Sequence, residues 1–247
     1  MSIFSSWFNK KKDIEFVDTK RMSYHNFTVE RACDVKPNTY RTQLDKYGKH
    51  IMPKCPGILD YAQYGYIIPA WVDIHIMANK AGVSWFVGDG AKRGDRGFDN
   101  GVPMEAELVD GAFSAEGGVP STAILFGSPW KIFANKNISA VLNPAFYHST
   151  FLDDLHVVPG IVDYSGFHVV NFICMPKREC KVHIKAGEPL IHVMPFYNKD
   201  ISASVGPASQ KQCDKVNNNI PGDDTQYYRK FLGVKKRFNL NKEENEE

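Results

Sequence analysis

Between Ser121 and Tyr197 the chain is a succession of short apolar runs separated by glycine, proline or asparagine. Runs such as "STAILF", "FHVVNFICM" and "EPLIHVMPF" are rich in Val, Ile and Phe, which favour strands, and they are shorter than typical helices. The breaks between the runs carry turn-forming residues. This segment is therefore predicted to consist almost entirely of β-strands.

The preceding segment shows the same signature. Ile74, Ile76 and Ala78 alternate with more polar neighbours, as in a strand with one buried face, and the "NKAG" turn at 79–82 leads into a second apolar run. We therefore expect a mainly β fold with short helices, in a single β-rich domain over residues 13–200. The large aromatic side chains expected in its core are Trp71, Trp85 and Trp130.

The two ends and one internal loop differ in composition from this domain. Residues 1–12 are expected to form a flexible basic tail, and the glycine- and charge-rich segment 88–101 a variable exposed loop. Residues 201–247 are expected to hold a polar linker, a short basic-aromatic helix at 227–238 and an acidic disordered tail. The amino end has too few apolar residues to span a bilayer, so we expect no transmembrane segment.

Charge and cysteine content narrow the function classes. The net charge of +2 over 247 residues lacks the strong basic excess of a dedicated nucleic-acid-binding protein. The five cysteines are widely spread and form no Cys-x-x-Cys pair, which argues against a structural zinc site. An odd number of cysteines without a signal peptide favours reduced thiols in a cytoplasm.

The segment "PGIVDYSG" at 159–166 is the strongest candidate for chemistry. Pro and Gly allow a sharp entry, and Gly166 allows the chain to reverse after the strand. Asp163 would then lie near the turn, where a carboxylate can orient water or bind a ligand hydroxyl group. Asp163 is therefore our candidate catalytic residue, with Tyr164 and Gly166 as candidate ligand-binding neighbours.

A near copy of this segment, "PGILDY", occurs at 56–61. Tyr61, Tyr64 and Ile68 follow at the spacing of one helical face, whereas the residues after Asp163 alternate as in a strand. We interpret the repeat as a coincidence of sequence rather than a duplication.

Two further groups of polar residues are candidates for binding. Lys92 and Arg93 in the segment "GDGAKRGDRG" can contact phosphate, although the segment lacks the Walker spacing and also reads as an ordinary loop. His168, His183 and His192 lie in the strand-rich half, and the last two would face each other in a tight hairpin around Gly187. Polar strand faces explain these histidines more simply than a metal site, so we expect no metal and keep His192 as a ligand-binding candidate.

Residues 156–196 resemble the hairpins of the dUTPase and dCTP-deaminase group, which has the β-clip fold. The resemblance implies that Asp163 takes the place of the carboxylate that contacts the sugar and activates water, and that Gly187 precedes the last core strand. A bound nucleotide would bring Mg²⁺ with it. The family's glutamine position holds His192 here, and its Ser-rich phosphate-binding segment and Gly-rich carboxyl-terminal arm have no counterpart. The expected body is a β-clip (dUTPase-like) or a jelly-roll-like barrel.

The order of motifs along most of the chain is similar to that of a family of uncharacterised proteins from tailed, largely marine bacteriophages. The motifs are "KCPGILDYAQYGYIIPAWVDI", "SPWKIFANKNISAVLNP", "LHVVPGIVDYSGFHVVNFICM", "IKAGEPLIHVMPFYNKD" and "YYRKFLGVKKRF". This resemblance implies a phage protein that acts in the host cytoplasm during infection or in the virion, without implying a reaction.

Two functions remain open from the sequence. The first is a phage accessory protein that binds a small ligand, such as a nucleotide, near Asp163. The second is a non-enzymatic virion-structural or host-interaction protein that uses the same β scaffold, with phage or host proteins as partners. A homo-oligomer suits both, and we expect a trimer because short-stranded β domains share edges with their neighbours.

Overall fold

The computed structural model describes residues 13–18, 27–37, 56–88, 106–110, 119, 122–199, 201–204 and 206–219. Strands make up 51% of these residues, so the expectation of a mainly β fold is confirmed. The strands are β1 (Ile14–Asp18), β2 (Glu30–Arg31), β3 (Tyr66–Pro69), β4 (Ile74–Asn79), β5 (Gly82–Val87), β6 (Ala106–Asp110), β7 (Thr122–Ala134), β8 (Ile138–Pro144), β9 (Leu155–Val157), β10 (Gly160–Asp163), β11 (Val169–Pro176), β12 (Cys180–Ile184) and β13 (Pro189–Tyr197). The helices are η2 (Ala32–Asp34), α1 (Pro56–Gln63), η6 (Phe151–Asp153) and α2 (Gln210–Asn219).

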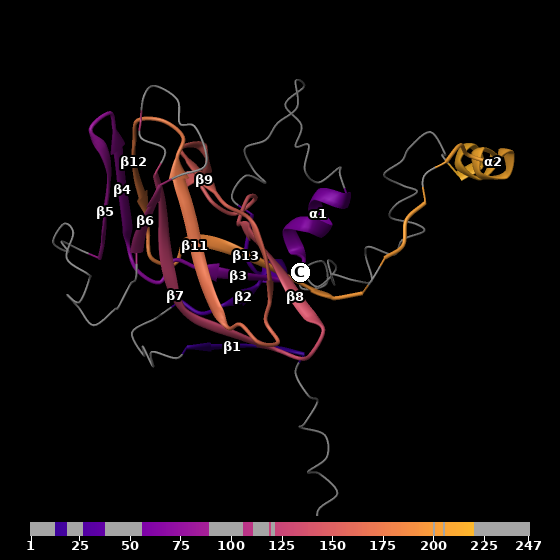
Figure 1. Ribbon diagram of the computed structural model, residues 1–247, viewed down its shortest axis with the longest axis horizontal. Coiled ribbons are helices and arrows are strands. Elements are labelled where there is room, and N and C mark those ends of the chain that lie inside the picture. Colours follow the sequence, from indigo (N-terminus) through magenta and orange to yellow (C-terminus); the bar gives the residue numbers. More distant parts are fainter. Residues whose placement is uncertain are drawn as a thin grey trace, which may run out of the picture.

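The strands form three antiparallel sheets (Figure 1). The first sheet has the order β1-β7-β11-β9, with β6 also paired to β7; the second has the order β10-β8-β13-β3-β2; the third has the order β12-β4-β5. All three sheets contribute to one apolar core. Fully buried members of this core include Ile68 and Val193 from the second sheet, Phe126 and Phe172 from the first, and Ile76 from the third. Its burial is the main favourable term in folding.

The alternation in β4 is confirmed, because Ile74, Ile76 and Ala78 are all buried. β4 and β5 form the expected hairpin, with Asn79 opposite Gly82. Among the tryptophans, Trp71 is buried, whereas Trp85 and Trp130 are partly buried against the core.

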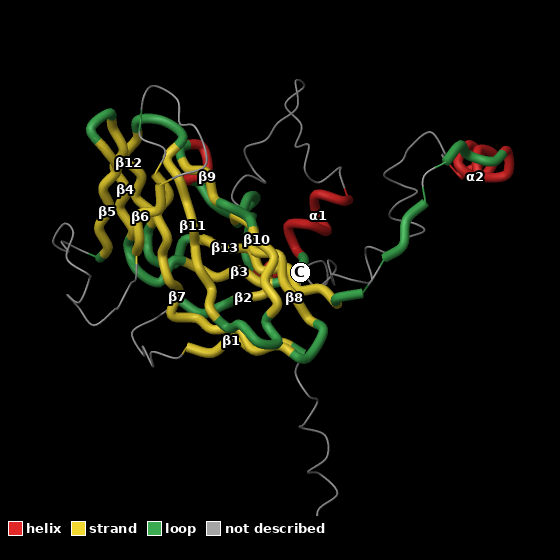
Figure 2. Tube along the Cα trace, in the orientation of Figure 1, coloured by secondary structure: helices red, strands yellow, loops and turns green. Residues whose placement is uncertain are grey.

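Three turns, including those expected at Gly166 and Gly187, connect strands of different sheets rather than closing hairpins (Figure 2). The turn at Asn137, whose φ is 71°, leads from β7 in the first sheet to β8 in the second. The turn after Asp163 leads from β10 back to β11 in the first sheet, and the turn at Gly187 leads from β12 in the third sheet to β13 in the second. His183 and His192 therefore do not face each other across a hairpin. The same turn residues can either close a hairpin or connect two sheets. Which of the two forms depends on the strands with which each flanking strand pairs.

Helix α2 occupies part of the segment that the sequence indicated as a polar linker. It begins with a capping box, in which the Ser209 N–H donates to Gln212 Oε1 (2.8 Å) and the Gln212 N–H donates to Ser209 Oγ (3.4 Å). A side-chain hydrogen bond between Gln210 and Asp214 adds support one turn later. In Figure 1 this helix stands apart from the sheets.

The tail at 1–12, the helix predicted at 227–238 and nearly all of the loop 88–101 lie outside the described residues. No helix in the described part of the chain is both long and apolar enough to cross a membrane. The four cysteines within that part, Cys33, Cys174, Cys180 and Cys213, are free thiols.

Gly65 provides a direct test of the connection between α1 and β3. Its φ is +82°, and a Cβ atom there would lie 2.2 Å from the carbonyl oxygen of Val193. We expect Gly65→Ala to lower the free energy of unfolding by more than about 2 kcal/mol, because backbone strain and a backbone clash add together. Gly160→Ala is the control, since nothing lies within 4 Å of a Cβ atom at that position. Urea denaturation measures both, and equal stabilities of the two variants would contradict the prediction.

Candidate functional site

Asp163 ends β10 and is exposed. Its Oδ1 accepts a hydrogen bond from the Ser165 N–H (2.9 Å), and its carbonyl oxygen accepts one from the Phe167 N–H (3.3 Å). Hydrogen bonds from the Ser165 backbone, and then from its side chain, hold the pKa of Asp163 below its usual value. The carboxylate therefore stabilises the turn that leads from β10 to β11, and it also presents a negative charge at the surface.

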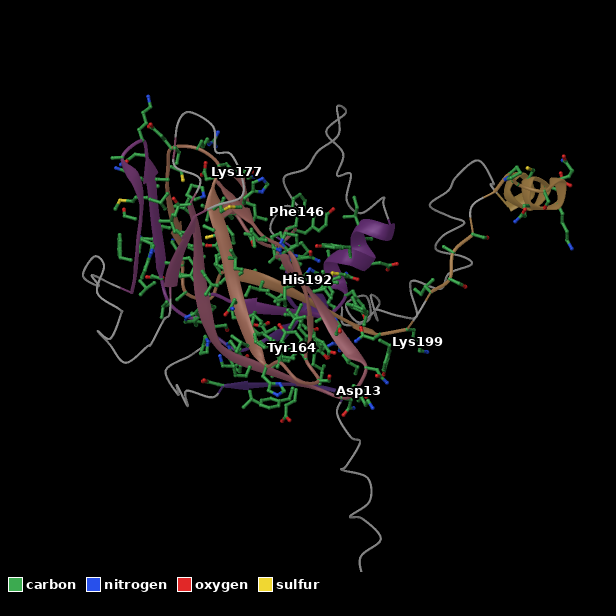
Figure 3. All side chains as sticks on the ribbon, in the orientation of Figure 1. Asp13, Phe146, Tyr164, Lys177, His192 and Lys199 are labelled. Carbon is green, nitrogen blue, oxygen red and sulfur yellow. The ribbon has the colours of Figure 1, made fainter. Side chains whose placement is uncertain are left out.

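The other candidate ligand-binding residues do not gather around Asp163. The Tyr164 side chain is fully buried (0% exposed), and burial raises the pKa of its phenol, whose hydroxyl group has no hydrogen-bond partner. Figure 3 labels His192 beside α1 and Tyr164 farther away, toward β1. Gly166 lies on the exposed turn, with nothing within 4 Å of a Cβ atom. Lys92 and Arg93 lie outside the described residues.

His192 belongs instead to a buried aromatic group between α1 and the second sheet. Its Nε2–H donates to the carbonyl oxygen of Tyr64 (2.5 Å), and its ring lies 5.3 Å from the ring of Tyr61 and 6.1 Å from that of His148. Burial lowers the pKa of His192, partly opposed by the Tyr64 carbonyl group. Both histidines are almost completely inaccessible to solvent, so this group holds α1 against the sheet rather than forming an open site.

His148 is the more strongly perturbed histidine of this pair. Neither of its ring nitrogens makes a hydrogen bond of normal geometry. Burial, reinforced by the nearby His192 and partly opposed by the backbone of Val35, lowers the pKa of His148 to about 4. The imidazole is consequently neutral in the folded protein at neutral pH.

The outer face of the second sheet carries an exposed apolar row that sequence reasoning did not identify. Ile161 on β10 lies opposite Val141 on β8, which in turn lies opposite Met194 on β13. Directly opposed residues of antiparallel strands project from the same face of a sheet. Phe196 lies on this face in the next row. Ile161 is 71% exposed and Phe196 is 37% exposed. We call Ile161, Val141, Met194 and Phe196 the outer-face patch.

The patch reaches a free edge of the sheet. β10 is the terminal strand in the order β10-β8-β13-β3-β2, so in the described part of the chain only its β8 side is paired. The other end of the same face, at His192, is covered by Tyr61 of α1. This face is thus covered at its His192 end and exposed at Ile161 and Phe196. In the sequence, the two-residue spacing of Ile161 and Asp163 indicates that both project from one face of a strand. Only the pairing of β10 with β8 shows that this is the outer face of the second sheet.

A second cluster lies on the third sheet. Asp73, His75 and His183 have donor atoms that all lie within 4.8 Å of one another. His183, which sequence reasoning had paired with His192, lies opposite His75 on β4. His168 stacks on Phe133 in a different sheet, and its Nδ1 contacts the Ile132 carbonyl oxygen (2.9 Å). Asp73 and His75 were missed, although the "DIH" motif in the predicted strand places both on one face.

No protein-family model matches the chain, and no curated protein matches it. The sites above are accordingly interpreted from their own geometry.

Stability should fall in acid because of His148. The unfolded histidine binds a proton near pH 6.5, whereas the folded one does so only near pH 4. Between these values the unfolded state binds more protons, so the free energy of unfolding decreases as the pH falls, by roughly 3 kcal/mol in total from this residue. Urea denaturation from pH 7 to pH 4.5 measures the loss.

His148→Leu should make this loss smaller, because it removes the titrating group. His156→Leu, at an exposed position on β9, is the matched control and should keep the acid sensitivity of the unmodified protein. An unchanged pH dependence in His148→Leu would show that other groups cause the acid sensitivity.

Proposed function

We propose that the protein is a non-enzymatic interaction protein, a virion-structural or host-interaction component of a tailed bacteriophage. It associates with other chains through the outer-face patch and the edge of β10 that no described strand pairs with. The observation that carries this proposal is the 71% exposure of Ile161 on an edge strand, in register with Val141 and Met194. The phage setting rests on the order of sequence motifs described above, and with it we propose a location in the host cytoplasm during infection or in the virion.

Edge strands attract further strands, because their outward N–H and C=O groups lack partners in the sheet. Lysine and proline often protect such edges, but the four residues of β10, Gly160–Asp163, include neither. A strand this short offers few backbone hydrogen bonds. Apolar contact through Ile161 and Phe196 would therefore supply much of the association free energy.

A second copy of this chain is the partner that we propose first. The row from Ile161 to Met194 is apolar and Asp163 is the only charged residue of β10, so two such edges can meet without opposing several like charges. Two identical β10 edges that pair with each other close a two-fold dimer, whereas the expected trimer would need each β10 edge to bind a different surface of the neighbouring copy. Phage or host proteins that present an edge strand with an apolar face are the other partners consistent with this surface.

The small-ligand function receives less support from the geometry. Asp163 has its carboxylate committed to a turn, Tyr164 is buried, and His192 lies beneath α1. A hydrolase of the dUTPase type needs several phosphate contacts around its catalytic carboxylate. A nucleotide site at Asp163 stays a prediction of the sequence.

Ile161→Lys tests the association. In sedimentation velocity or light scattering, the unmodified chain should be oligomeric, and the variant should shift to the monomer because lysine places a charge in the apolar contact. Ile201→Lys is the matched control, since Ile201 is 90% exposed but lies beyond β13. A monomeric unmodified chain at all soluble concentrations, or an oligomer that persists in Ile161→Lys, would contradict self-association through β10.

The two functions also differ in their response to nucleotides. Because ligands of the folded state raise the melting temperature, a nucleotide site would be revealed by a thermal shift. We expect nucleoside triphosphates with Mg²⁺ to leave the melting temperature unchanged. A rise that disappears in Asp163→Asn would instead support the small-ligand function.

A further inference from the structure

The Asp73–His75–His183 cluster lies on the third sheet, away from the outer-face patch. Asp73 directly precedes β4, His75 is on β4, and His183 is on β12. His183 Nε2 lies 3.8 Å from Asp73 Oδ1, and the donor atoms of the three side chains all lie within 4.8 Å of one another. Two imidazole nitrogens and one carboxylate oxygen thus gather at one place.

Strand register brings the two histidines together. His183 lies opposite His75, and His75 lies opposite Phe86 on β5, so the three rings form a row across the whole sheet. The His75 ring stacks on the His183 ring with centroids 4.0 Å apart, and on the Phe86 ring with centroids 4.2 Å apart. The central imidazole is therefore held between two flat rings, and the sheet fixes the backbone of both histidines.

The carboxylate is positioned from the neighbouring turn. The Ala186 N–H donates to Asp73 Oδ1 (2.7 Å). Two backbone hydrogen bonds join the same segments: the Ala70 N–H donates to the Glu188 carbonyl oxygen, and the Gly187 N–H donates to the Ala70 carbonyl oxygen, both at 2.8 Å. Such outer hydrogen bonds orient the carboxylate ligands of metal sites.

We infer that Asp73, His75 and His183 form a binding site for a divalent first-row transition metal ion. Two imidazoles and one carboxylate suit Zn²⁺, Fe²⁺, Co²⁺ or Ni²⁺, whereas Mg²⁺ and Ca²⁺ prefer sites made only of oxygen ligands. The site goes beyond the proposed association and does not depend on it, because no residue of the cluster belongs to β10 or to the outer-face patch.

The geometry requires a small adjustment on binding. Metal–ligand bonds of about 2.0–2.2 Å place the donors of a tetrahedral ion about 3.3 Å apart, so the present donors must converge by up to about 1.5 Å. The His183 side chain is 41% exposed, which leaves its ring room to turn from the stack toward Asp73. The same exposure would leave water in the remaining coordination positions.

Metal titration of the full-length chain without a polyhistidine tag tests the inference. Isothermal titration calorimetry with Zn²⁺, and visible absorption with Co²⁺, should report one site that excess Mg²⁺ does not displace. Replacing His183 by Ala should weaken the affinity at least about ten-fold and abolish the ligand-field bands of Co²⁺ at this site. Bound Zn²⁺ should raise the melting temperature of the unmodified chain by more than that of the variant.

His156→Ala is the matched control, because His156 is an exposed histidine on a strand of another sheet. It should bind Zn²⁺ like the unmodified chain. Circular dichroism checks that each variant is folded, and His183→Gln replaces His183→Ala if the latter is not. The inference is overturned if the unmodified chain binds neither Zn²⁺ nor Co²⁺, or if the His183 variant binds both with unchanged affinity and spectrum.

Discussion

The apolar core shared by three sheets is the constraint on which the rest of the structure depends. No single sheet buries its inner face alone: Ile76 of the third sheet, Phe126 and Phe172 of the first, and Val193 of the second all reach the same cluster. The chain satisfies this requirement by crossing between sheets at tight turns, of which the Asn137 and Gly187 turns are examples. Each strand that enters a new sheet in this way packs its more apolar side on the core and turns its polar or less buried side away from the core. The outer-face patch and the Asp73–His75–His183 cluster are both products of that arrangement.

The two surfaces differ in how firmly they are held. The cluster is supported from three strands and from a turn whose Ala186 N–H binds Asp73. The patch ends at β10, which is paired on one side only among the described residues. The sheet fixes the backbone of the cluster while the exposed His183 ring can still turn toward Asp73, which suits ion coordination, whereas a short edge strand suits association with another chain. The buried pair of His148 and His192 belongs to neither surface, and its position beneath α1 makes it a pH-sensitive part of the core.

Local patterns in the sequence predicted the mainly β fold and the β4–β5 hairpin, but not the pairing of most other strands. The alternation at Ile74 and Ile76 predicted a buried strand face correctly. The near-identical segments "PGILDY" and "PGIVDY" enter helix α1 and strand β10, so six residues do not determine a conformation here. Ile68, expected on a helical face, lies in β3 because the strand pairs with β13. The same dependence on distant partners explains why His183 could be assigned to a polar strand face but not to a position opposite His75.

The connection between β3 and β13 has a consequence for biosynthesis. Tyr64, just before β3, is in contact with His192, 128 residues later in the chain. Until β13 has been synthesised, the β3–β2 pair and the β8–β10 pair lack the strand that joins them into one sheet. Pairings of such large sequence separation form slowly, since long loops must close first. The pairing of β3 and β8 with β13 is therefore expected to be a late step of folding, which requires the whole of the segment from β3 to β13 to have been synthesised.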